Sequence, residues 1–137
     1  MKKSVAVTIL AATLFGCASQ PQPQHEFDAG HVLQGIQASA TVRTEISVYY
    51  MERGQFPASN RELGLPEPGK FSGHPLTALE VSEGGVMTLT YGERSGVKNG
   101  VVQLIPAWSP HQGILWQCVT PSYPGLLEAA PDCEYAP

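Results

Sequence analysis

The fold is decided by residues 31–57, which end in Tyr49-Tyr50-Met51-Glu52-Arg53-Gly54-Gln55-Phe56-Pro57. Apolar residues recur there at steps of three and four, which places them on one side of a helix with 3.6 residues per turn. They are Val32, Ile36, Ala40, Val42, Ile46, Tyr49 and Tyr50. Gly54 suits the left-handed conformation at a helix end, and Pro57 lacks the N–H needed to continue the helix. Because one helix cannot bury its apolar side alone, a second layer must cover it.

Four strands are predicted after this helix, over residues 76–81, 86–91, 101–105 and 114–119. In the second of them Met87, Leu89 and Tyr91 alternate with threonines, the pattern of a sheet with one buried face and one solvent-facing face. Pro106 predicts that the third strand ends there or lies at an edge. The expected fold class is α+β, with a long N-terminal amphipathic helix packed on a four-stranded antiparallel sheet. Residues 58–73 are expected to form an irregular connection over the sheet edge.

Length and charge limit the possible functions. A chain of 137 residues is enough for one compact domain. The net charge of −4 includes Lys2 and Lys3, and losing these two cations with a signal peptide lowers it to −6. An acidic chain is poorly suited to bulk capture of nucleic acid, which needs clustered cations.

The N-terminus has the pattern of a signal peptide. Met1-Lys2-Lys3 is basic, and the apolar run 5–15 is too short to span a bilayer. The junction Leu14-Phe15-Gly16-Cys17 resembles the lipobox of bacterial lipoproteins, with Phe15 where a small residue is usual. The resemblance implies removal of residues 1–16 and lipidation of Cys17, which anchors the protein to a membrane. Because Ala18 and Ser19, which directly follow Cys17, are not aspartates, it also implies the outer membrane. An ordinary cleaved signal, with Cys17 incidental, is the alternative.

Residues 17–30 are expected to form a tether between Cys17 and a globular domain of residues 31–137. The run Ser19-Gln20-Pro21-Gln22-Pro23-Gln24 is of low complexity and favours an extended chain. Four residues at its end carry side chains that can bind metals, but their spacing is not a standard zinc pattern, and we interpret them as solvated linker residues. They are His25, Glu26, Asp28 and His31.

Three cysteines need an assignment in an exported protein. With Cys17 at the predicted lipidation site, Cys118 and Cys133 can pair with each other, which implies an oxidising compartment. Their disulfide would close the proline-rich tail 120–133 into a loop.

In order and spacing, several motifs resemble the globular domain of type IV pilins over about residues 38–133. The helix ends in Tyr49-Tyr50 and is followed by Gly54-Gln55-Phe56-Pro57, Leu63-Gly64-Leu65, Leu104-Ile105-Pro106 and Trp116-Gln117-Cys118. The resemblance implies that Cys118 pairs with Cys133. It also implies that the region between these cysteines, and the connection 57–73, are exposed surfaces used in subunit contacts and adhesion.

The N-terminal region departs from the pilin pattern. Pilins begin with a prepilin-peptidase site and a long hydrophobic helix with a glutamate near its start, and we find neither in residues 1–30. We therefore expect a pilin-like domain presented by a lipid and a tether rather than one polymerised through a hydrophobic stalk.

Residues that could carry chemistry are few. There is no Gly-x-Ser-x-Gly or His-Glu-x-x-His motif and no phosphate-binding glycine loop, so we expect no enzymatic activity, cofactor or metal. His74 and His111 lie in loops without an evident partner. Trp108 and Trp116 either form a ligand platform or, as is more usual for aromatics at alternate strand positions, fill the core.

A partner-binding surface is predicted at Arg94, Lys98 and Tyr123. The predicted function is that of a non-enzymatic, pilin-like outer-membrane lipoprotein with a structural, interaction or adhesion role linked to type IV pili. Its partners would be the membrane, through Cys17, and pilus or pilin-like proteins, with no small-molecule substrate. Two alternatives remain: a periplasmic binding module or inhibitor unrelated to pili, and a DNA-uptake accessory that uses the cations of Arg94 and Lys98.

Overall fold

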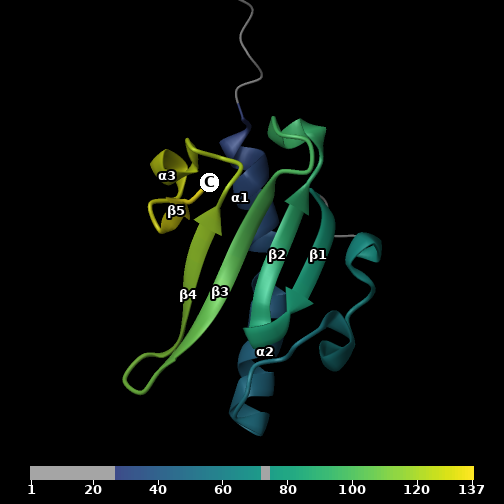
Figure 1. Cartoon of the computed structure of the whole chain (residues 1–137), viewed down its shortest axis with the longest axis vertical. Coiled ribbons are helices and arrows are strands. Elements are labelled where there is room, and N and C mark those ends of the chain that lie inside the picture. Colours follow the sequence, from purple (N-terminus) through teal and green to yellow (C-terminus); the bar gives the residue numbers. More distant parts are fainter. Residues whose placement is uncertain (1–26, 72–74) are drawn as a thin grey trace, which may run out of the picture.

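A computed structural model describes residues 27–71 and 75–137 (Figure 1). The chain opens with two helices, α1 (Ala29–Ala38) and α2 (Ala40–Arg53), which are separated only by Ser39. In Figure 1 they lie behind the sheet as one long, slightly broken rod. The predicted long N-terminal helix is therefore confirmed.

The helix begins earlier than predicted. Asp28 caps it by accepting a hydrogen bond from the His31 N–H (3.0 Å), and the Asp28 N–H donates to the carbonyl of Ser95 (3.0 Å). The ring of Phe27 packs against that of Tyr123, with 5.8 Å between centroids. Residues 27–30, predicted to end the tether, thus belong to the folded domain, while His25 and Glu26 lie outside the described residues.

The break at Ser39 was not predicted. Its side chain is fully buried, and its hydroxyl donates to the carbonyl of Ile36 (2.6 Å). A serine hydroxyl bonded to a preceding carbonyl competes with the helical ladder and bends the chain. The C-terminal end agrees with prediction, because Gly54 adopts a left-handed conformation (φ 69°) and its N–H donates to the carbonyl of Tyr50 (2.8 Å).

The sheet has five strands, so the prediction of four was wrong. They are β1 (Leu76–Ser82), β2 (Val86–Tyr91), β3 (Val101–Ser109), β4 (Gly113–Thr120) and β5 (Cys133–Tyr135), paired in that order. The first three pairings are antiparallel, as expected, whereas β5 runs parallel to β4. A three-residue strand gives no periodic signal. Strand β5 also follows β4 only after a long connection, which includes the short helix α3 (Leu126–Ala129).

Pro106 does not end the third strand. Strand β3 pairs with β2 only as far as Leu104, but with β4 as far as Ser109, and Pro106 lies opposite Trp116 in the second pairing. Beyond Leu104, β3 therefore has a paired strand on one side only. A residue without an N–H is tolerated there, as the edge alternative anticipated.

The core lies between the helices and the inner face of the sheet. Of the residues predicted to face inward from the helix, Ala40 is exposed, whereas Val32, Val42 and Ile46 are buried. Tyr91 on β2 is also fully buried, and its hydroxyl donates to the carbonyl of Val32 (2.7 Å). The remaining buried apolar residues on the sheet include Leu76, Leu79, Val81, Met87, Leu89, Val102 and Leu104.

Candidate interaction surfaces

The connection between α2 and β1 is fixed to the sheet by the side chain of Asn60. Its amide N–H groups donate to the carbonyls of Pro66 and Leu79 (2.8 Å each), and its oxygen accepts from the N–H of Val81 (2.6 Å). Strand β1 is at the sheet edge, so Asn60 bonds the groups that a neighbouring strand would otherwise pair. This contact holds the predicted irregular connection along the edge.

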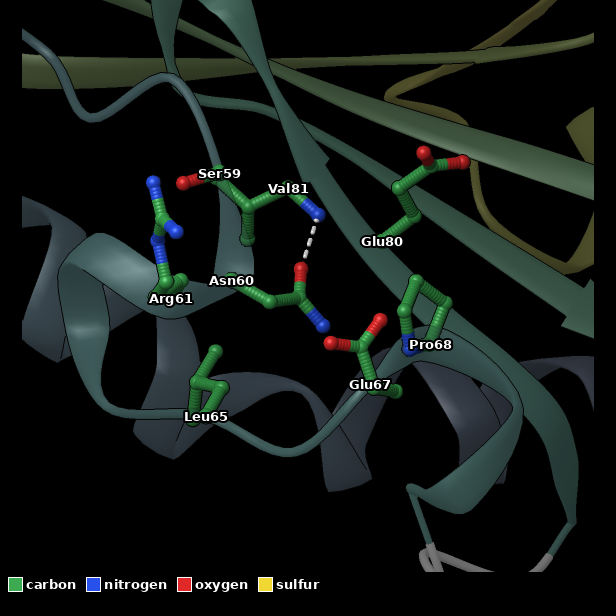
Figure 2. Close-up of a pocket in the computed structure, with 8 residues that line it drawn as sticks. All are labelled: Ser59, Asn60, Arg61, Leu65, Glu67, Pro68, Glu80 and Val81. Carbon is green, nitrogen blue, oxygen red and sulfur yellow. Dashed lines mark hydrogen bonds between the residues drawn. The ribbon is translucent and has the colours of Figure 1, made fainter.

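A pocket of about 300 Å³ surrounds Asn60 (Figure 2). In Figure 2 the guanidinium of Arg61 and the carboxylate of Glu80 are directed away from the Asn60 amide. The other lining residues are Ser59, Leu65, Glu67, Pro68 and Val81. Because the amide of Asn60 is already bonded to the backbone, the polar groups left for a ligand are those at the rim.

The same connection is tied to the helix by Glu62. One carboxylate oxygen of Glu62 accepts hydrogen bonds from the hydroxyl of Tyr49 (2.9 Å) and the N–H of Ala58 (3.0 Å). The Ala58 bond, followed by the Tyr49 bond, lowers the pKa of Glu62, and the bond to Glu62 raises the pKa of Tyr49. The guanidinium of Arg53 lies over the Tyr49 ring, 4.7 Å from its centroid. These contacts join the end of α2 to residues 58–62.

The two tryptophans have different environments. Trp116 is half-buried against the core, as the core interpretation predicted. Trp108 is 46% exposed and stacks on Tyr50, with 5.4 Å between ring centroids. Both side chains belong to the helix-facing side of the sheet, because they continue, at alternate positions, the row of the buried pair Leu104 and Cys118. Strands β3 and β4 project beyond β2, so less of the domain covers Trp108, and the core interpretation is wrong for this residue.

The predicted surface at Arg94, Lys98 and Tyr123 is not formed as expected. Arg94 and Lys98 are exposed in the loop between β2 and β3, and the Lys98 ammonium lies 3.3 Å from the Glu93 carboxylate. Tyr123 has no exposed surface, and its hydroxyl donates to the Ser95 hydroxyl (2.8 Å). Burial raises the pKa of Tyr123. Its assignment to a partner-binding surface is therefore wrong: Tyr123 supports the loop from beneath.

The disulfide between Cys118 and Cys133 is confirmed. It joins residues that lie opposite each other in the β4–β5 pairing, so it holds the fifth strand on the sheet. Leu127 of α3 and Tyr135 of β5 are exposed on this C-terminal region. His111 is exposed at the tip of the β3–β4 hairpin, whereas Cys17 and His74 lie outside the described residues.

Residues 27–71 and 75–137 contain no group of three or more His, Cys, Asp or Glu side chains that could hold a metal ion. No helix in these ranges is long and apolar enough to cross a membrane.

The structure is thus an α+β domain. Two consecutive helices cover one face of a mostly antiparallel sheet, and a disulfide holds the last strand. Residues 30–137 match the family of pilins, the subunits of bacterial filaments, so the chain belongs to the pilin family. Among curated proteins, we found no relative that matches it. Pilins are structural proteins, and membership supports a pilin-like structural role and association with pilus or pilin-like proteins.

Proposed function

We propose that this protein is a lipid-anchored pilin that stands on the outer membrane and acts without catalysis, by docking with pilus components or by presenting an adhesive surface. The observation that best supports this proposal is that the match to the pilin family begins at residue 30, only a short segment after Leu14-Phe15-Gly16-Cys17. Acyl chains on Cys17 would replace the hydrophobic stalk by which pilins are anchored, since two or more chains hold a protein stably at a membrane.

The shape of the domain supports this arrangement. The start of α1 lies at the end of the molecule that also carries the C-terminus (Figure 1), and Phe27, just before α1, packs against Tyr123. The end of α2 and the β3–β4 hairpin with Trp108 lie at the opposite end. Helices of 10 and 14 residues at 1.5 Å per residue separate the two ends by about 35 Å. A domain anchored through residue 17 would therefore present the α2 end and the hairpin farthest from the membrane.

The contacts of the basic loop do not favour the DNA-uptake alternative. Lys98 pairs with Glu93, so residues 93–98 carry two cations and one carboxylate. Electrostatic binding to phosphates needs a denser positive surface than this.

Metabolic labelling with a fatty-acid analogue tests the anchor. We expect the wild-type chain and a Ser19→Ala control to take up label and to sediment with membranes, and Cys17→Ser to do neither. An unlabelled wild-type chain would contradict the anchor.

Copurification from cells that express pili tests the docking role separately. We expect pilin-like proteins to copurify with the wild-type chain and with Cys17→Ser in detergent, because the pilin domain would make the contact. Their absence from both preparations would favour the alternative of a binding module unrelated to pili.

A further inference from the structure

The solvent-facing side of the sheet carries no charge across its three middle strands. Residues 99–127, which include β3 and β4, contain no Asp, Glu, Lys or Arg. The strand pairings place one row of side chains on this side, alternating with the buried row. We call it the uncharged face and define it by Thr88, Gln103, Ile105, Ala107, Leu115, Gln117 and Val119.

The uncharged face is open to solvent in the described chain. Both helices lie on the other side of the sheet, so this side is turned to the viewer in Figure 1. Leu115 is 45% exposed, and its neighbour Ala107 is also exposed. Apolar side chains on a surface without charges are typical of protein interfaces, whose centres are depleted of charged residues.

Among the residues of the described strands, charges appear on this side only at its two edges. Glu80 on β1 lies beside Thr88, and Glu134 on β5 lies beside Val119. Both are carboxylates, and the whole chain has a net charge of −4. Two copies carry the same net charge, so they approach each other with least repulsion through the uncharged face, with the carboxylates left at the rim.

We propose that the uncharged face packs against the same face of a second copy to form a two-fold symmetric dimer. A pleated sheet face is shaped to pack on another sheet face, and a two-fold axis lets one surface serve both partners. Three strands about 4.8 Å apart and about 25 Å long give a footprint of about 350 Å². This is below the roughly 800 Å² per partner of a standard interface, so the dimer is weak and reversible. The proposal does not depend on the lipid anchor or on pilus docking.

Sedimentation equilibrium over a range of concentrations tests the dimer. Every chain carries Cys17→Ser, so that no acyl group contributes. We expect a concentration-dependent dimer, and we expect Leu115→Glu to weaken it about tenfold or more, because the variant buries facing carboxylates in an apolar contact. Val48→Glu is the matched control, since Val48 is similarly exposed (49%) but lies on α2, outside the uncharged face. It should dimerise like the parent.

Salt dependence gives a second readout. An apolar contact between two acidic chains should strengthen as salt screens their repulsion, whereas a contact made by ion pairs would weaken. Circular dichroism must show that Leu115→Glu is folded, and Ala107→Glu replaces it if it is not. A monomer at all concentrations, equal effects of Leu115→Glu and Val48→Glu, or weakening by salt would each overturn the proposal.

Discussion

At the scale of single residues, two side chains hold the helix-to-sheet connection in place, and neither could be identified from the sequence. Both lie in the stretch 58–73 that was expected to form an irregular connection, and nothing in the sequence distinguishes them from their neighbours. Their roles arise from groups that are distant in sequence: Leu79 and Val81 for Asn60, and Tyr49 for Glu62. Hydrogen bonds of this kind have no sequence period, so pattern analysis does not detect them.

Replacing Asn60 with alanine should lower the free energy of unfolding by about 3 kcal/mol, because backbone groups at a buried edge lose their partners. Ser59→Ala changes a neighbouring side chain that makes no capping hydrogen bond and should be near neutral. Urea unfolding followed by circular dichroism measures both variants. Equal, small effects would show that Asn60 does not hold the edge.

The contribution of Glu62 should depend on pH. Its pKa is lowered in the folded state, so its stabilising effect is complete above the ordinary carboxyl value of about 4.3 and is lost as pH falls through the lowered value. Glu62→Gln keeps an acceptor but cannot titrate. The wild-type protein should therefore be more stable than Glu62→Gln at neutral pH, and the difference should become smaller at an acidic pH below the ordinary carboxyl value. Urea unfolding at both pH values is the measurement, and a difference that stays constant would contradict the assignment.

At the scale of elements, the helix and the strands with strong periodicity were predicted well. Strand β2 has the predicted bounds, because the alternation of Met87, Leu89 and Tyr91 is unambiguous. Elements that depend on non-local contacts were missed. Strand β5 is held by the disulfide to Cys118, and the break in the helix depends on the buried hydroxyl of Ser39. The same limit explains Trp108, whose exposure follows from where β2 stops pairing with β3.

The packing of α1 on β2 gives a prediction in which two effects oppose each other. A Cβ atom at Gly35 would overlap the ring and hydroxyl of Tyr91. Helix propensity alone would make Gly35→Ala stabilising by about 1 kcal/mol, but overpacking a buried contact costs about 1–3 kcal/mol. Because the Tyr91 hydroxyl is held by Val32, the ring cannot easily move, and we expect net destabilisation. Thermal unfolding decides the sign, with Gly30→Ala in the exposed first turn of α1 as the control. A stabilised Gly35→Ala would show that the helix shifts freely on the sheet.

At the scale of the whole molecule, the sequence indicated one α+β domain of the pilin type, and the family match over residues 30–137 agrees with that class. The interaction surface was predicted less well. Arg94 and Lys98 are exposed as expected, but Tyr123 is buried beneath their loop. The uncharged face was not predicted at all, although the charge-free run 99–127 was a visible signal. The sequence does not show which side of the sheet the helices cover, so it does not show which side is left open to solvent.

The position of Phe27 against Tyr123 also determines how the protein can be tagged. A fluorescent protein fused after Pro137 would lie at the end of the domain where α1 begins (Figure 1). A small dye or epitope placed at residues 110–112, in the turn between β3 and β4, would instead sit at the far end and leave the start of α1 unobstructed.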